Sequence, residues 1–207
     1  MSYPLQHPTL MGTIWPETGH GRVTREAWRK MTLALAGTLL LTLSAKVQIP
    51  FYPVPMTMTT LVVLMIGVAY GWRLGGATVL LYLAQGAAGL PVFAGTPEKG
   101  IGLAYMVGPT AGYLAGFLLA AVVVGWLAER GWDRRIGSTV LMMLIGNLVL
   151  YIPGLLWLGW LFGWDKPILE WGLTPFLLGD ALKLAVAAAT LPVLWRVLQR
   201  RSETRHP

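Results

Sequence analysis

The chain has 207 residues, of which 55% are hydrophobic and only 12% are charged, and its formal net charge is +7. Soluble domains carry about 25% charged residues, so this composition excludes an ordinary soluble protein and indicates an integral membrane protein. Cysteine is absent, which excludes disulfides and thiolate metal sites, and the positive charge is better explained by membrane orientation than by nucleic-acid binding.

Apolar segments recur along the chain, which predicts an all-α integral membrane protein with six transmembrane helices. The predicted spans are 31–47, 56–71, 74–90, 108–128, 137–162 and 174–196. They form a membrane domain, 31–198, between an N-terminal segment, 1–30, and a basic tail, 199–207. The first span does not resemble a cleaved signal peptide, because about 30 residues precede it and further spans follow.

The sixteen Lys and Arg residues are distributed unevenly between the two sides of these spans. One side holds twelve of them: Arg22, Arg25, Arg29, Lys30, Arg73, Arg130, Arg134, Arg135, Arg196, Arg200, Arg201 and Arg205. The opposite loops hold Lys46, Lys99 and Lys166, and Lys183 lies within the sixth span. Since cytoplasmic loops carry the excess of basic residues, both termini are predicted to be cytoplasmic.

Two Pro- and Gly-rich loops lie on the predicted external side. In "VQIPFYPVPMTMTT", 47–60, three prolines prevent helix continuation, so the chain is expected to turn there in an extended form. The loop 89–112 contains apolar side chains, including Phe93 and Tyr105, that a fully solvated loop would lack. Both loops are interpreted as lids over an apolar site, with interfacial anchoring by aromatic residues as the alternative. Gly108, Gly112 and Gly116 then predict close helix packing.

Polar side chains share one face on each of two outward-running spans. The third span carries Tyr82 and Gln85 in a stripe of small and polar residues, and the fifth carries Asn147 and Tyr151. Each of these residues alone is more simply explained as a hydrogen-bonding contact between membrane helices.

The sixth span contains two charges, Asp180 and Lys183, on one helix face. Each costs about 2.5–3.5 kcal/mol at a bilayer centre, whereas an exposed i,i+3 ion pair returns only about 0.2–0.5 kcal/mol. This imbalance favours a functional role. The histidines, His7, His20 and His206, all lie near the termini, so no His-based metal site or general base is expected in the membrane.

Several motifs together resemble one transporter family. The segments "IPFYPVPMTMTTLVVLMIG", "LGGATVLLYLAQGAAGLPVFAG", "GPTAGYLAGF" and "GDALK" follow the order and spacing of the biotin-specific substrate-binding subunit, BioY, of energy-coupling factor (ECF) transporters. The resemblance covers roughly residues 30–198. It implies a six-helix subunit, not an enzyme, in a bacterial cytoplasmic (inner) membrane. Such a subunit captures external biotin and is surrounded by membrane lipid. It works with a transmembrane coupling subunit and two ABC-type ATPases, although some members act without dedicated ATPases.

The resemblance also implies roles for individual residues. Asp180 would accept ureido N–H bonds, and Lys183 would contact either the ureido oxygen or the carboxylate tail of biotin. The substrate-binding set would be completed by Tyr82, Gln85, Asn147 and Tyr151, and by Phe93 and Gly95 of the lid "GLPVFAG".

The sequence departs from the family pattern at two places. Thr59 stands where many relatives carry Gln, and Ala34 and Thr38 stand where substrate subunits often show an Ala-xxx-Ala pattern for docking the coupling subunit.

The sequence is also compatible with other functions to different degrees. A substrate subunit for another small vitamin and a stand-alone biotin carrier are the main alternatives. An intramembrane enzyme would need clustered acids, histidines or metal ligands, and a purely structural subunit would leave the charged pair unexplained. No cofactor is expected, and without a Walker motif the chain is not expected to hydrolyse nucleotide.

Overall fold

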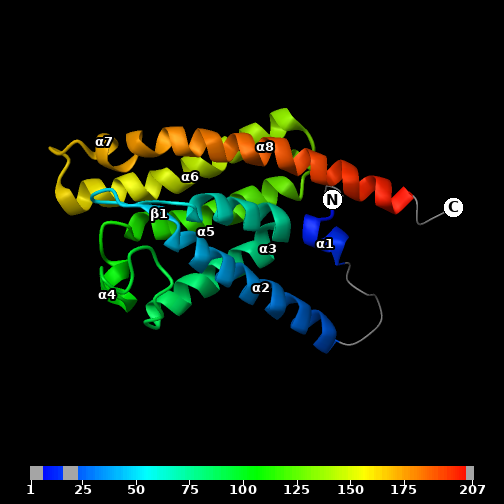
Figure 1. The fold of residues 1–207 in the computed structure, drawn as a ribbon, viewed down its shortest axis with the longest axis horizontal. Coiled ribbons are helices and arrows are strands. Elements are labelled where there is room, and N and C mark those ends of the chain that lie inside the picture. The colour runs from blue at the N-terminus through cyan, green and yellow to red at the C-terminus, as the bar shows by residue number, and fades with distance from the viewer. Residues whose placement is uncertain (1–6, 16–22, 204–207) are drawn as a thin grey trace, which may run out of the picture.

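The computed structural model describes residues 7–15 and 23–203, and this part of the chain is largely helical (Figure 1). In chain order the elements are α1 (Leu10–Ile14), α2 (Val23–Lys46), β1 (Gln48–Ile49), β2 (Met56–Thr57), α3 (Thr59–Ala87), α4 (Gly102–Met106), α5 (Ala111–Ala128), the 3-10 helix η1 (Trp132–Arg134), α6 (Ile136–Phe162), α7 (Ile168–Gly172) and α8 (Thr174–Glu203). His20, His206, Arg22 and Arg205 lie outside the described residues.

Four described segments are long and apolar enough to cross a membrane, so the chain is a multi-pass membrane protein. They are Thr59–Ala87, Ala111–Ala128, Ile136–Phe162 and Ile168–Leu198. Helix α2 corresponds to the predicted first span but is not among the four. It begins earlier than predicted, and its first turns carry the charges of Arg25, Glu26, Arg29 and Lys30.

Helix α3 consists of two helical arms joined at Gly71, whose backbone is non-helical with φ 79° and ψ 175°. A Cβ placed on Gly75 would lie 3.2 Å from the Cα of Gly67. Residues eight apart in a continuous helix are separated by about 12 Å along the axis, so the second arm folds back on the first. The two arms correspond to the predicted spans 56–71 and 74–90.

Small residues allow the helices to approach closely around α5. A Cβ on Gly112 would lie 2.2 Å from the Pro153 carbonyl oxygen, and one on Gly116 would lie 2.4 Å from that of Leu150, both in α6. The predicted close packing is therefore confirmed for these two glycines. Gly108 lies before α5, where the nearest atom to an added Cβ is the Tyr105 carbonyl oxygen at 3.1 Å.

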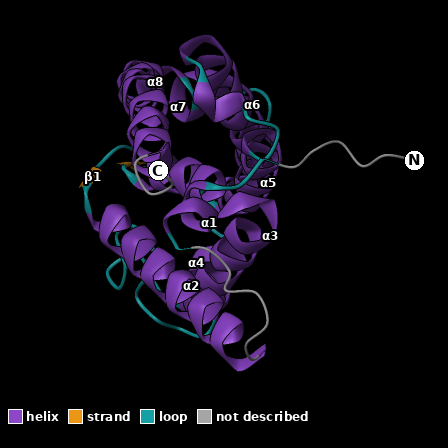
Figure 2. Cartoon of the chain, turned by 90° about the vertical axis from the view of Figure 1, so that its right-hand side faces the viewer, coloured by secondary structure: helices purple, strands orange, loops and turns teal. Residues whose placement is uncertain are grey.

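The proline-rich and glycine-rich loops gather at one end of the helices, where Figure 1 shows β1, α4 and α7. The first loop is extended, as predicted, but β1 and β2 pair as a short antiparallel hairpin, a small departure from an all-α fold. Figure 2 shows α2 running across the lower part of the view, apart from α6 and α8.

The opposite end of the molecule is closed by short polar contacts. The Glu129 carboxylate accepts a hydrogen bond from the Trp72 amide at 3.3 Å, and the Glu129 carbonyl accepts one from His7 N at 2.8 Å. Nearby, the indole of Trp195 donates to the carboxylate of Asp133, and the Arg134 guanidinium lies 4.4 Å from the Trp195 ring centroid. The described basic residues of the 73 and 130–135 turns therefore lie at this end.

Candidate functional site

A cavity lies between the helices beneath the two loops. About 580 Å³ of its space is not occupied by atoms, part of it open to solvent. Helices α2, α3, α5, α6 and α8 all contribute to its walls, and residues of the loops before and after α3 line it as well. Its lining residues are Ala45, Val54, Pro55, Thr57, Thr59, Thr60, Tyr82, Phe93, Ala94, Tyr105, Thr110, Tyr113, Leu114, Phe117, Leu150, Tyr151, Phe176, Asp180 and Lys183.

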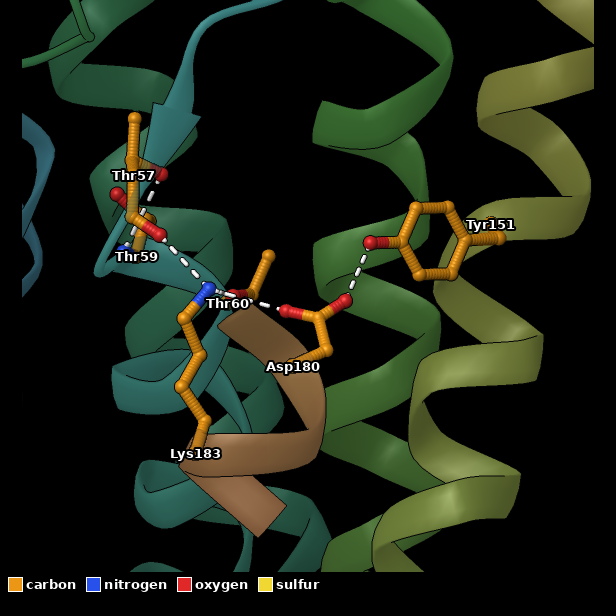
Figure 3. A network of polar contacts seen from close by, with 6 residues as sticks. All are labelled: Thr57, Thr59, Thr60, Tyr151, Asp180 and Lys183. Carbon is orange, nitrogen blue, oxygen red and sulfur yellow. Dashed lines mark hydrogen bonds and ion pairs between the residues drawn. The ribbon is translucent and has the colours of Figure 1, made fainter. Parts of the chain in front are cut away.

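The two charges of α8 lie at this cavity as a buried ion pair. Lys183 Nζ lies 3.0 Å from Asp180 Oδ1, and the side chains are only 12% and 8% exposed. The other carboxylate oxygen of Asp180 accepts a hydrogen bond from the Tyr151 hydroxyl of α6 (Figure 3). Each carboxylate oxygen therefore has one donor, and since a carboxylate accepts up to about four hydrogen bonds, capacity remains for a bound molecule.

The ammonium of Lys183 is held on its other side by the chain that enters α3. It donates to the Thr57 carbonyl oxygen at 3.0 Å and to the Thr60 hydroxyl at 2.8 Å, as Figure 3 shows. With Asp180 it has three acceptors, which matches its three N–H donors. The charged pair thus ties α8, α6 and the proline-rich loop together at the cavity wall.

Aromatic rings form much of the remaining wall. Tyr82 meets Phe93 edge-on at 5.3 Å between ring centroids, and Phe93 stacks on Tyr105 at 5.0 Å. Tyr151 contacts Tyr113 at 6.1 Å and Phe176 at 6.4 Å. A cavity with apolar walls and a few convergent polar groups is the usual form of a small-molecule site. In the part of the chain that the structure describes, no cluster of His, Asp or Glu is arranged to hold a metal ion.

Comparison with known proteins identifies the family. The model of the BioY family matches residues 18–200, most of the chain. The chain belongs to the BioY family. It is 35% identical to a "Biotin transporter BioY" of Thermotoga maritima over 77% of this chain and 92% of the relative, and 39% identical to one of Rhodobacter capsulatus over 76% and 88%. A "Probable biotin transporter BioY" of Pyrococcus horikoshii is 33% identical over 77% and 91%.

A solved structure shares the fold. The crystal structure of the S-component for biotin from an ECF-type ABC transporter superposes with a TM-score of 0.67 at 22% identity, over 85% of this chain and 95% of that one. The family match and the sequence relatives confirm the resemblance inferred from the motifs. Since BioY is a family of transporters, the prediction that the chain is not an enzyme is confirmed as well.

The structure brings together five of the residues that the BioY resemblance assigned to substrate. Asp180, Lys183, Tyr82, Tyr151 and Phe93 all line the cavity. Tyr82 also donates its hydroxyl to the Val92 carbonyl oxygen at 3.1 Å.

Three predicted binding residues lie elsewhere. Asn147 lines a separate small hollow that shares Thr60 and Lys183 with the cavity. The Gln85 amide points toward α2, where it donates to the Thr38 hydroxyl at 3.4 Å. Gly95 does not line the cavity; it supports the lid turn with φ 69°, while its neighbour Ala94 lines the cavity. The substrate contacts of Gln85 and Gly95 therefore stay predictions, since neither residue lines the cavity.

Sequence reasoning missed several lining residues of the BioY cavity. Thr57 and Thr60 lie within the quoted "PMTMTT" segment, but nothing in the sequence tells which of its threonines faces Lys183. Tyr113 and Phe176 are aromatic residues on apolar helices, indistinguishable by sequence from lipid-facing ones. Thr59, which stands where many relatives carry Gln, is 2% exposed and lines the cavity.

The predicted docking residues on α2 differ in accessibility. Thr38 is 3% exposed, because its side chain packs toward α3 and accepts the Gln85 hydrogen bond. Thr38 thus offers little surface to a partner, and its docking role stays a prediction. Ala34 is half-buried, and the neighbouring exposed residues of α2 are large and apolar, including Leu35 at 54% and Leu39 at 60%.

Proposed function

We propose that this chain is the biotin-binding S component of an ECF-type transporter in a bacterial cytoplasmic membrane. The observation that carries the proposal is the buried pair of Asp180 and Lys183 at an otherwise largely apolar cavity beneath two loops. Membership of the BioY family and the names of its curated relatives support the same ligand.

The chemistry of biotin suits this cavity. Its ureido ring is neutral and offers two N–H donors and one acceptor, its fused rings are apolar, and its tail carries a carboxylate. The free lone pairs of Asp180 can accept a ureido N–H, and the rings of Phe93 and Tyr105 offer apolar surface to the fused rings. Lys183 lies where it can shift one of its donors to either the ureido oxygen or the tail carboxylate.

A ligand panel tests the substrate. We expect biotin to raise the melting temperature of the purified protein, because a ligand that binds only the folded state stabilises it by RT ln(1 + [L]/Kd). Mass spectrometry of protein purified from cells is expected to find biotin. Stabilisation by another small vitamin with no response to biotin would instead support the first alternative, a substrate subunit of different specificity.

We also propose that the chain crosses the membrane six times with both termini cytoplasmic. The two arms of α3 that fold back at Gly71, together with α2, α5, α6 and α8, supply six helical segments. The concentration of basic residues at the end opposite the loops supports the orientation. Transport would then need a coupling subunit and ABC-type ATPases, while a stand-alone carrier remains the alternative that uptake without those partners would support.

A further inference from the structure

The loop 88–101 covers the cavity and is held in place by a side chain from a distant part of the chain. Phe93 and Ala94 line the cavity and are 1% and 8% exposed. Lys46, the last residue of α2, donates from Nζ to the Phe93 carbonyl oxygen at 3.0 Å, to the Thr96 carbonyl oxygen at 2.9 Å and to the Thr96 hydroxyl at 3.1 Å. All three donors of its ammonium are thus used on one turn of the lid.

These contacts are not the ordinary behaviour of a lysine at a helix end. A C-terminal lysine usually interacts with the last carbonyls of its own helix, but the acceptors of Lys46 lie 47 and 50 residues further along the chain. They are also neutral, and no ion pair among the described residues involves Lys46. The position of its charge is therefore set by the lid and not by a carboxylate.

The other attachments of the lid come from different elements. Tyr82 of α3 donates to the Val92 carbonyl oxygen, and the Phe93 ring packs between Tyr82 and Tyr105. Within the turn, the Thr96 hydroxyl donates to the Phe93 carbonyl oxygen at 2.7 Å. Lys46 thus ties this turn to α2, and its neighbour Ala45 also lines the cavity.

We propose that Lys46 is a positioning residue that latches the 88–101 loop closed, and thereby sets how long a molecule remains in the cavity. The proposal rests on the proposed function for the identity of that molecule, but the latch itself requires only the lid. Because one ammonium supplies all three bonds, withdrawing the outer end of α2 from the lid would break them together.

The first test measures lid opening without ligand. The chain has no native cysteine, so Ala94→Cys reports opening through its rate of reaction with a water-soluble maleimide in detergent. We expect Lys46→Met to raise this rate about tenfold or more, since hydrogen bonds from a charged donor are lost. Lys99→Met is the matched control. It removes the same charge from the lid itself, where Lys99 is exposed and its ammonium makes no hydrogen bond to the described part of the chain. It is expected to leave the rate unchanged.

A second reporter separates latch loss from general loosening. Ala188 of α8 is 6% exposed and does not line the cavity, so Ala188→Cys reports the helical core. The latch predicts faster labelling of Ala94→Cys alone. Equal acceleration at both reporters, or none at Ala94→Cys, would overturn it. Lys46→Arg keeps a multi-donor cation and is expected to fall between wild type and Lys46→Met.

The third measurement is biotin dissociation by ligand chase. We expect about tenfold faster dissociation from Lys46→Met than from wild type and from Lys99→Met, with melting temperatures of the unliganded proteins nearly unchanged. An unchanged rate of biotin dissociation from Lys46→Met would refute the proposal that Lys46 sets how long the ligand remains bound. If wild type bound no biotin, the proposed function would fail, while the labelling experiment would still decide the latch.

Discussion

At the scale of single residues, the structure explains how a membrane helix holds two charges. Lys183 uses its three donors on Asp180, the Thr57 carbonyl and the Thr60 hydroxyl, and Asp180 receives a second donor from Tyr151. The charges are therefore paired and hydrogen-bonded, which is the condition under which buried ions are tolerated. The arrangement leaves acceptor capacity on Asp180 at the cavity, so pairing and substrate recognition use the same groups.

The pair predicts an asymmetric response to truncation. Lys183→Ala leaves Asp180 buried without its counter-charge, a situation that costs about 3–5 kcal/mol when a buried pair is broken. We expect biotin affinity, measured by calorimetry, to fall by more than the loss of one hydrogen bond. Thr60→Val is the matched control. It removes one acceptor of Lys183 and is expected to weaken biotin binding by only about 1 kcal/mol. Binding by Lys183→Ala equal to that of wild type would refute the assigned role, and lost stability with unchanged affinity would favour a structural one.

A second buried carboxylate, Asp133, lies at the opposite end and predicts a pH dependence. Burial raises the pKa of Asp133 above its ordinary value, although the hydrogen bond from Trp195 acts in the other direction. The folded state therefore binds the proton more tightly than the unfolded state, and this group makes folding less favourable as pH rises above its ordinary pKa.

The expected result is a difference between two variants. Asp133→Asn keeps an acceptor for Trp195 but removes the titration, so its stability relative to wild type is expected to be greater at about pH 7 than at about pH 4. Asp133→Leu removes the acceptor as well as the titration, so it is expected to be about 1–3 kcal/mol less stable than Asp133→Asn at both pH values. Thermal unfolding in detergent across this range measures both. Parallel curves for wild type and Asp133→Asn would show that Asp133 is not the titrating group.

At the scale of elements, the sequence predicted most helices because long apolar segments and prolines have strong local signals. The spans 137–162 and 108–128 differ from α6 and α5 by at most three residues at either end. The helix α4 and the hairpin β1–β2 were not predicted, since both are short and depend on packing over the cavity. The same limit applies at the site. Periodicity placed Gln85 on the face of Tyr82, but the structure turns the Gln85 amide to Thr38 of α2, a choice made by tertiary contact.

Helix α2 carries a prediction about coupling. Ala34 is half-buried and distant in sequence from the charged pair. If a partner docks near Ala34, Ala34→Trp replaces a small side chain with a large one and prevents the partner helix from approaching closely. We expect biotin uptake by cells that contain a coupling subunit to fall several-fold, while binding by the purified variant persists.

Two outcomes would count against this docking site. Unchanged uptake would place the contact on another surface or favour a carrier that acts alone. Equal loss of uptake and binding would mean that the substitution disrupts the fold. Leu39→Trp, at an exposed apolar position of the same helix, is the matched control for added bulk.

At the scale of the whole molecule, the two ends differ in structure and charge. The lid, the hairpin and α7 lie at one end, where Figure 1 shows β1, α4 and α7. The turn at Gly71, Glu129 and η1 contact one another, the start of the described chain and the C-terminal part of α8, which lie at the other end. The four apolar segments establish a multi-pass protein, while the number of crossings and their direction depend on how the arms of α3 and helix α2 sit in the bilayer.

Single cysteines test the orientation directly. Ser138, in the first turn of α6 beside the basic 130–135 turn, is predicted to be cytoplasmic, and Glu98, in the exposed part of the lid, is predicted to be external. In intact cells an impermeant maleimide is expected to label Glu98→Cys but not Ser138→Cys, and to label both after the membrane is opened. Ready labelling of Ser138→Cys in intact cells would reverse the topology and turn the cavity toward the cytoplasm.

The central claim is that the Asp180–Lys183 cavity binds biotin, and calorimetric titration of the purified, ligand-free chain tests it most directly. We expect saturable binding of one biotin per chain, severely weakened by Lys183→Ala and little changed by Thr60→Val. The absence of saturable binding to folded wild-type protein, or binding that Lys183→Ala leaves intact, would contradict the claim.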